Sequence, residues 1–372
     1  MNTEHLQLIT DLRRALHRHP ELSLCERGTM ERLKGFLRTH TTFQIVERDG
    51  WFYAVKPGRD GAAMPIAFRA DTDALPIPED IDLPYGSVCE GVSHKCGHDG
   101  HCAALCGLAL ALEQMPPERT VYLIFQGAEE IGQGAVRCAP LLGEKGIGEI
   151  YAFHNLGGYP EGSVIYRRGL TQPASEGLTI ALHGRQSHAS APESGVNPAE
   201  AIARIVLYSR ELLDAPHGGM VLCTVTGVQV GTGDFGISAG DGEIRLTLRA
   251  ENEAEMHEME QALLRFAAQQ AQERGLTMEH SISDYFPETR NHDGCLDKVA
   301  RAAGALGIPC REMDRLWRAS EDFGHYTKVC PGAIFYIGNG EHYPPLHTGA
   351  YDFNDRILPA AVDLFTALAL GK

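Results

Sequence analysis

Four short apolar runs constrain the fold of this chain more than any other feature. They are PIAFRA at 65–70, TVYLIF at 120–125, EIYAF at 149–153 and AIFYI at 333–337. Continuous runs of this length are typical of parallel strands that are covered on both faces. Because helical patterns alternate with these runs, we expect an α/β protein built on a mostly parallel, doubly wound sheet.

The middle of the chain has a different pattern. Between residues 172 and 286 the periodicity predicts strand, helix, strand, strand, helix and strand, in that order. This order is typical of a ferredoxin-like α+β unit. Since the segment interrupts the sheet pattern, we predict a discontinuous catalytic domain, residues 1–171 and 287–372, with a smaller domain inserted at 172–286.

Composition excludes several kinds of partner. The formal net charge of −16 argues against binding to nucleic acid or to anionic membranes, which need basic surface. No apolar run approaches the roughly 20 residues that span a bilayer, and the amphipathic N-terminus lacks the apolar core of a secretory signal. The ten cysteines have no repeated spacing, which indicates reduced, mostly buried thiols. We therefore expect a cytoplasmic protein.

The segment SHKCGHDGH, residues 93–101, concentrates three histidines, a cysteine and an aspartate just before an apolar helical run. Its glycines allow the backbone to bend closely, so that Cys96 and His98 can face one point. Thiolate and imidazole are good ligands for a borderline-soft divalent metal. A solvated polar turn is the alternative interpretation of this segment taken alone.

Further metal-ligand side chains follow the predicted strands. Asp73 comes shortly after the first apolar run, Glu129 and Glu130 after the second, and His154 after the third, while His347 lies on a loop beyond the last. In open α/β sheets, ligands bind outside the carboxyl ends of the strands. The positions of these residues therefore predict one shared metal site.

Five protein ligands are too many for one tetrahedral ion with an open position, but they suit two ions that share a bridge. Our working assignment is Cys96, His98 and His154 around one ion, and Cys96, Glu130 and His347 around the other. Zinc or manganese would serve, and cobalt or nickel is compatible. Next to ligand Glu130, Glu129 is the expected general base. An exposed acidic pair is the alternative interpretation of these glutamates.

Three further residues are candidates for the site. Asp73 is predicted to orient a ligating imidazole, with a turn cap as the alternative. His188 lies on a Gly/Pro-rich loop of the inserted segment, where its imidazole could donate to a developing oxyanion. Arg249 could hold a substrate carboxylate through paired hydrogen bonds, or form a surface ion pair.

Taken together, seven motifs resemble those of the aminoacylase/carboxypeptidase-like dinuclear metallohydrolases. The resemblance is to the amidohydrolase branch in particular, which includes hippurate hydrolases, indole-acetyl-amino-acid hydrolases and N-acetyl-diaminopimelate deacetylases. The motifs are RADTDALP (69–76), HKCGHDGH (94–101), GAEE (127–130), FHN (153–155), GRQSHASAP (184–192), ASEDFGHY (319–326) and HTGAYDFND (347–355).

The resemblance implies cleavage of an amide between an acyl group and an amino acid. It implies that the five candidate ligands bind metal and that Glu129 is the base. It also implies that the inserted domain forms a homodimer, and that His188 reaches an active site, often the one in the partner subunit. The chain departs from the family near Phe235, where an asparagine is usual, and at ASEG (174–177). These departures affect substrate recognition and spare the ligand and base positions.

We therefore predict a metal-dependent amidohydrolase that deacylates a small N-acyl-amino acid. A metallo-dipeptidase or aminopeptidase is the alternative within hydrolases, and a catalytically inactive metal-binding protein is the alternative outside them. A nucleotide-binding oxidoreductase is disfavoured, because no GxGxxG follows the first strand.

Overall fold

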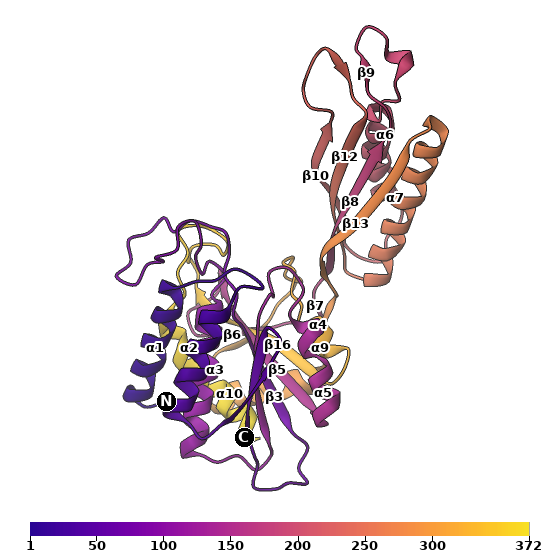
Figure 1. Cartoon of the computed structure of the whole chain (residues 1–372). Coiled ribbons are helices and arrows are strands. Elements are labelled where there is room, and N and C mark those ends of the chain that lie inside the picture. The colour runs from indigo at the N-terminus through magenta and orange to yellow at the C-terminus, as the bar shows by residue number, and fades with distance from the viewer. Residues whose placement is uncertain (372) are drawn as a thin grey trace. The chain divides into compact units, whose positions relative to one another are not determined.

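The computed structural model describes residues 1–371, which fall into two compact units (Figure 1). The first unit comprises Met1–Thr171, Thr289–Leu316 and the described residues 321–371. The second comprises Gln172–Glu288 and Trp317–Ser320. The chain thus leaves the first unit near its middle and later returns to it.

An eight-stranded sheet in the order β1-β2-β4-β3-β5-β16-β6-β15 forms the centre of the first unit. Its strands are β1 (Gln44–Arg48), β2 (Trp51–Lys56), β3 (Ile66–Asp71), β4 (Val121–Gln126), β5 (Glu149–Gly157), β6 (Val164–Tyr166), β15 (Cys310–Glu312) and β16 (Gly332–Gly340). The neighbours β4, β3, β5 and β16 run parallel, whereas β1–β2, β2–β4 and β16–β6 pair antiparallel. The predicted α/β fold is confirmed, but the sheet is mixed, with the four predicted apolar runs as its parallel centre.

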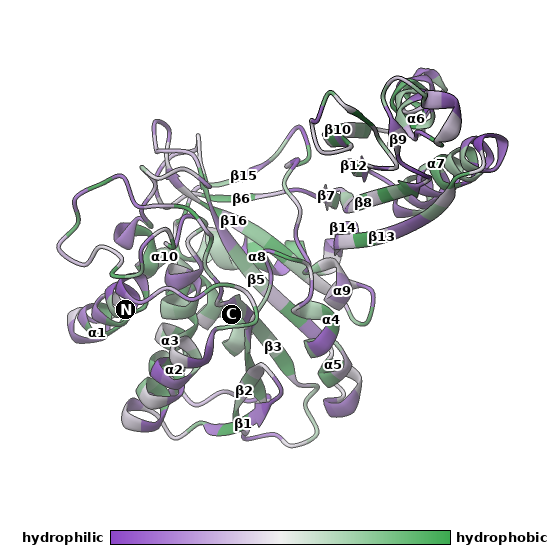
Figure 2. Ribbon diagram, turned by 45° about the horizontal axis from the view of Figure 1, so that its top comes forward, coloured by the Kyte–Doolittle hydropathy of each residue, from purple (hydrophilic) through white to green (hydrophobic). Residues whose placement is uncertain are grey.

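Helices cover both faces of this sheet (Figure 1). One face carries α1 (Thr3–Arg18), α2 (Arg27–His40), α3 (His98–Gln114), α8 (Asp293–Ala305) and α10 (Leu358–Leu370), and the other carries α4 (Ala135–Cys138), α5 (Pro140–Lys145) and α9 (Gly324–Thr327). Successive strand residues point to opposite faces, so Phe68 joins the first core and Ala67 the second. This double burial explains why the central strands are mostly apolar, and they are largely green in Figure 2.

Helix α3 begins at His98, directly after a sharp turn. Gly97 has a φ of 100°, a conformation that favours glycine. A Cβ at Gly97 would also lie 2.4 Å from Oδ1 of Asn155. The helix is buried along most of its length between α1 and α10. Its first residue is therefore held rigidly beside the carboxyl ends of the central strands.

The second unit contains a four-stranded antiparallel sheet in the order β10-β12-β8-β13. Its elements follow one another as β8 (Ala174–His183), α6 (Ala199–Glu211), β10 (Val221–Val230), β12 (Asp241–Ala250), α7 (Glu253–Arg274) and β13 (Thr277–Phe286). The alternating residues Leu178, Ile180 and Leu182 of β8 share a core with Met259 and Leu263 of α7. The two helices thus cover one face of this sheet.

Short elements complete the chain. Two-residue strands β9 (Ser187–His188) and β11 (Ile237–Ser238) pair in the second unit, and β7 (Gly169–Gln172) pairs with β14 (Thr289–Asn291). The 3-10 helices are Pro192–Ser194, Leu212–Asp214 and Asp355–Ile357. Within residues 1–371, no helix has the length and apolar character needed to cross a membrane. All ten cysteines are free thiols and most are buried, in agreement with the prediction.

Candidate metal centre

The five predicted ligands converge at one edge of the first unit's sheet. Ligand atoms of Cys96, His98 and His154 all lie within 4.8 Å of one another, and so do those of Cys96, Glu130 and His347. The two groups correspond to the two sets that the sequence hypothesis assigned to two ions. Cys96 belongs to both groups, which is the position of a bridging ligand.

Distances within the cluster are compatible with shared ions. The sulfur of Cys96 lies 3.3 Å from Nε2 of His154 and 3.3 Å from Nε2 of His347. Oε1 of Glu130 lies 3.7 Å from Nε2 of His98 and 3.7 Å from Nε2 of His347. Ligand atoms at about 2.0–2.3 Å from one ion stand roughly 3 to 4.5 Å apart. The side chains therefore need little movement to enclose metal.

Backbone carbonyls orient two of the imidazoles. Nδ1 of His98 donates to the carbonyl oxygen of Asp73 at 2.9 Å, and Nδ1 of His154 donates to the carbonyl oxygen of Asn155 at 2.8 Å. A carbonyl oxygen can only accept a hydrogen bond, so Nδ1 carries the hydrogen in both rings. Nε2 of each ring then faces the cluster, as metal ligation requires.

The carboxylate of Asp73 holds the turn that carries the two glutamates. It accepts the backbone N–H groups of Glu129 at 3.1 Å and of Glu130 at 3.0 Å, and Ser23 Oγ donates to it at 2.7 Å. Its Oδ1 is 3.5 Å from Nδ1 of His98, farther than the Asp73 carbonyl oxygen. Asp73 therefore orients the imidazole through its backbone and the glutamates through its side chain.

Two buried atoms of the cluster have no hydrogen-bond partner within residues 1–371, namely Nε2 of His98 and Oε1 of Glu130. Buried polar groups without partners are costly. Burial, reinforced by the charge of Glu130, raises the pKa of the Cys96 thiol well above its usual range. Burial also raises the pKa of Glu130 to about 7. Divalent cations would supply the missing partners and stabilise the anionic donors, so these residues fit a dinuclear centre.

Glu129 lies beside the cluster and belongs to a further possible ligand group with His98 and Glu130. Its Oε2 is 3.8 Å from Nε2 of His98, and the residue is 6% exposed. Burial and the neighbouring charges of Glu321 and Glu130 raise the pKa of Glu129 well above that of a free carboxyl. A carboxyl with a raised pKa at the edge of a candidate metal site is suited to accepting and releasing a proton.

The sequence pattern did not predict a buried polar network that lies behind the candidate ligands. The two ring nitrogens of His101 lie 2.6 Å from Oδ1 of Asp71 and 2.7 Å from Oδ1 of Asn155. Arg69 donates to Oδ2 of Asp71 and to Oδ1 of Asp322, both at 2.8 Å. One signal was available: Arg69 stands inside an apolar run, where a buried guanidinium requires carboxylate partners.

His347 is the most accessible of the five predicted ligands. Its side chain is 51% exposed, whereas that of Glu130 is 10% exposed. The His347 backbone has a φ of 60°, and its N–H donates to the carbonyl oxygen of Lys95 at 2.8 Å. Nζ of Lys95 is itself buried and donates to Glu79 and to the carbonyl oxygen of Tyr351. The loop of His347 is thus tied to the loop of Cys96, and the cluster opens to solvent at this ligand.

His188 and Arg249 belong to the second unit, whereas the ligand cluster belongs to the first. His188 is exposed on β9, and its Nδ1 accepts the N–H of Ser190 at 3.1 Å. Arg249 on β12 donates through Nη1 to the carbonyl oxygen of Arg318 at 2.7 Å and to Ser320 Oγ at 3.1 Å.

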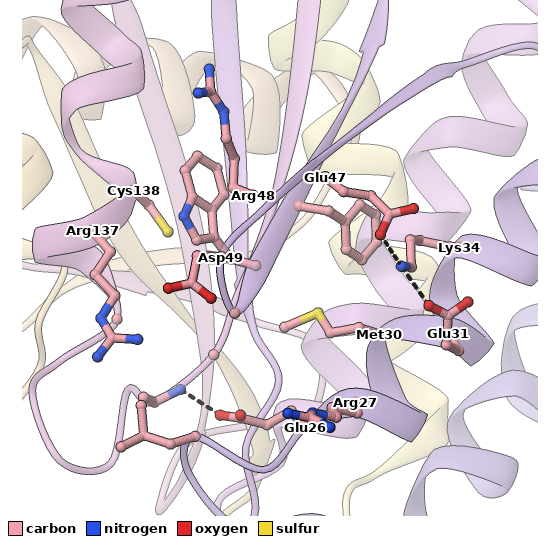
Figure 3. Close-up of a pocket in the computed structure, with 17 residues that line it drawn as sticks. Glu26, Arg27, Met30, Glu31, Lys34, Glu47, Arg48, Asp49, Arg137 and Cys138 are labelled. Carbon is pink, nitrogen blue, oxygen red and sulfur yellow. Dashed lines mark hydrogen bonds and ion pairs between the residues drawn. The ribbon is translucent and has the colours of Figure 1, made fainter.

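A cavity of about 660 Å³ in the first unit is bordered by the Gly127–Ala128 segment that leads into the glutamate turn (Figure 3). Its other walls come from α2, the β1–β2 hairpin and α4. Glu26 in its wall accepts the N–H of Ala128 at 2.7 Å, and burial raises the pKa of Glu26 to about 7. None of the five predicted ligands lines this cavity, so it is distinct from the predicted metal site.

Comparison with known proteins identifies the family of this chain. Residues 67–371 match peptidase family M20/M25/M40, and the chain belongs to that family. Proteins of this family are hydrolases that act on amide bonds, which confirms both the resemblance and the predicted enzyme class.

Relatives match along almost the whole chain. N-acetylcysteine deacetylase of Bacillus subtilis is 29% identical over 98% of this chain and 97% of its own length. Hippurate hydrolase of Campylobacter jejuni is 28% identical over 96% and 95%. A crystal structure from Bacillus subtilis, described as a dinuclear metal-binding peptidase of the M20 family, superposes with a TM-score of 0.82 at 27% identity, covering 99% of this chain and 98% of that one.

Proposed function

We propose that this protein is a metal-dependent amidohydrolase that cleaves the amide of an N-acyl-amino acid. The observation that carries the proposal is the pair of ligand groups sharing Cys96, with buried, unpartnered ligand atoms on His98 and Glu130. Two relatives whose names describe deacylation of acylated amino acids support the substrate class. The relative described as binding two metals supports the dinuclear assignment.

In this proposal five residues hold two divalent ions: Cys96, His98, Glu130, His154 and His347. Zinc or manganese fits the mixed thiolate, imidazole and carboxylate donors, and cobalt or nickel is compatible. When bound, such ions polarise the amide carbonyl and lower the pKa of water. The backbone carbonyls of Asp73 and Asn155 keep the ring nitrogens of His98 and His154 directed at the ions.

Glu129 moves the proton. It accepts a proton from the attacking water, whose oxygen bonds to the acyl carbon, and it delivers that proton to the nitrogen as the C–N bond breaks. Burial and the charges of Glu321 and Glu130 raise the pKa of Glu129, which strengthens its carboxylate as a proton acceptor. Asp73 keeps Glu129 in position, because its carboxylate accepts the backbone N–H groups of Glu129 and Glu130. The products are a carboxylic acid and a free amino acid.

We further propose that residues 172–286 form an inserted domain through which two chains pair. In this arrangement His188 donates to the carbonyl oxygen of the substrate and Arg249 binds its carboxylate. The exposure of His188 supports a role toward a partner. Mixing inactive His188→Ala with inactive Glu129→Gln subunits should restore activity if the site is shared. No recovery after proven subunit exchange would contradict sharing.

A release assay tests the reaction and the substrate class together. Metal-free protein is loaded in turn with zinc, manganese, cobalt or nickel and offered N-acetyl-, N-benzoyl- and indole-acetyl-amino acids beside dipeptides with a free α-amino group. We expect amino acid release from an acylated substrate and none from the dipeptides. Faster cleavage of the dipeptides would favour a dipeptidase or aminopeptidase. Metal binding without any cleavage would favour an inactive metal-binding protein.

A further inference from the structure

A separate cluster of metal-ligand side chains lies within the second unit, between β8 and α7. Glu176 projects from β8, and His257 and Glu260 project from α7, with one ligand atom of each within 4.8 Å of the others. His257 and Glu260 are three residues apart, so they lie on one face of the helix. Glu176 shares its sheet face with Leu178 and Ile180, which pack in the same core as α7.

Glu176 is the unusual member of this cluster. It is 2% exposed, and its Oε1 has no hydrogen-bond partner within the described chain. Burial raises the pKa of Glu176 to about 7, and the charges of Glu260 and Glu253 raise it further. A buried carboxylate whose charged neighbours are also carboxylates is costly. Either a proton or a cation must compensate it.

The surroundings of the cluster restrict what compensates Glu176. The ring of Tyr285 stacks on that of His257, with centroids 5.9 Å apart and an interplanar angle of 10°. The Tyr285 hydroxyl donates a hydrogen bond to Glu253, so the Glu253 carboxylate already has a partner. A bulge in β13 between Ser283 and Phe286 places Tyr285 at the level of Glu176. The imidazole of His257, held by this stacking, and the carboxylates of Glu176 and Glu260 therefore remain available to bind one cation.

We propose that Glu176, His257 and Glu260 form a divalent transition-metal site in the second unit. One imidazole nitrogen and two carboxylate oxygens suit Zn²⁺, whereas Mg²⁺ and Ca²⁺ favour oxygen donors alone. Ligand atoms about 2.2 Å from one ion stand at most about 4.4 Å apart, so small rotations close the site. The ion fastens α7 to β8, and water completes its coordination. This site is independent of the proposed amidohydrolase activity.

Zinc stoichiometry of the full-length protein tests the proposal. Metal-free protein is saturated with Zn²⁺, passed through gel filtration and analysed for zinc per chain. We expect His257→Ala and Glu260→Gln each to hold one equivalent fewer than the wild type, with unchanged circular dichroism. The matched controls are Glu258→Gln on α7 and His280→Ala on β13, both exposed, and they should hold as much zinc as the wild type. Excess Mg²⁺ should not displace the ion.

Two further variants test whether the zinc ion is bound here and not at the Cys96 cluster, and whether metal or a proton neutralises Glu176. In a Cys96→Ser/His98→Ala background, the equivalent that depends on His257 should persist. Glu176→Gln should abolish that equivalent while raising the melting temperature of the metal-free protein, because it removes the buried charge. Equal zinc content in wild type, His257→Ala and Glu260→Gln would overturn the proposal and show that Glu176 is held neutral by a proton.

Discussion

His98 donates its Nδ1 hydrogen to the backbone carbonyl oxygen of Asp73 across 2.9 Å. The second ring nitrogen, Nε2, is buried inside the ligand cluster, 3.6 Å from Oδ2 of Asp71. Burial disfavours a charged ring, but the carboxylates of Asp71, Asp73 and Glu130 outweigh it and raise the pKa of His98 to about 10. A metal ion must therefore displace a proton from His98, as it must from the Cys96 thiol.

Metal binding should release protons and strengthen with rising pH. Without metal, His98 and Cys96 hold protons at neutral pH, because their pKa values are raised. Each proton lost on binding makes the affinity for zinc rise with pH. Calorimetric titration in buffers of different ionisation enthalpy at pH 7 should report between two and three protons released per chain, because Glu130, whose pKa is about 7, is half protonated there. A zinc affinity that stays constant between pH 6 and pH 8 would contradict this picture.

Glu129→Gln should lower kcat by about 10²–10⁴-fold, the range expected for loss of a general base. Glutamine preserves the size of the side chain but cannot take a proton from water. Metal content and circular dichroism should remain those of the wild type. The neighbouring variant Glu130→Gln is the matched control, and it should lose metal as well as activity. Wild-type turnover by Glu129→Gln would show that the base is another group.

Cys96→Ser should reduce the number of ions held by the Cys96 cluster. A serine hydroxyl ionises far less readily than a thiol and bridges two ions poorly. Elemental analysis after gel filtration measures the change. Cys106→Ala is the control, because Cys106 is a buried thiol of α3, the helix that follows Cys96, and belongs to neither ligand group. Full metal content in Cys96→Ser would exclude the bridge.

Asp73→Asn should reduce kcat by about 10–100-fold, the usual cost of disturbing groups that orient metal ligands. The amide retains only one accepting oxygen, so the N–H groups of Glu129 and Glu130 compete for it. Ser23→Ala removes one donor to the same carboxylate and should cost about 1 kcal/mol of stability with little change in kcat. Equal kinetics in the two variants would mean that Asp73 does not hold the glutamates.

The stability of the first unit should fall at alkaline pH because of His17. Burial opposes its charged form, but hydrogen bonds to Asp99 and Glu79 outweigh burial and raise the pKa of His17 to about 9. Since the unfolded pKa is about 6.5, the stabilisation is complete below pH 6.5 and is lost as pH rises through 9.

This contribution is about 3 kcal/mol for a fully buried imidazole. Between pH 6 and pH 9.5, the free energy of unfolding of the wild type should fall by about that much more than that of His17→Gln. Urea denaturation at the two pH values measures both. His40→Gln is the control, because His40 is exposed. Parallel pH curves for the wild type and His17→Gln would contradict the assignment.

Strand limits illustrate what local pattern can predict. The run predicted at residues 120–125 agrees with β4 to within one residue at each end, because its apolar side chains are a local signal. The run predicted at 149–153 is too short, since β5 continues to Gly157 and contains His154 and Asn155. The polar side chains of His154 and Asn155 ended the apolar pattern there, yet both residues are buried. His154 belongs to the ligand cluster, and Asn155 lies against His101.

By itself the sequence determined the parallel centre of the sheet and the residue types able to bind metal, because strand periodicity and ligand chemistry are properties of short segments. Only the tertiary structure decided how these side chains are held and charged. Arg69 and Asp322, 253 positions apart, meet in one buried network, and Glu176 on β8 faces His257 on α7. Such pairings, and the pKa shifts that burial imposes on them, arise when folding brings distant segments together and removes water, which no local pattern records.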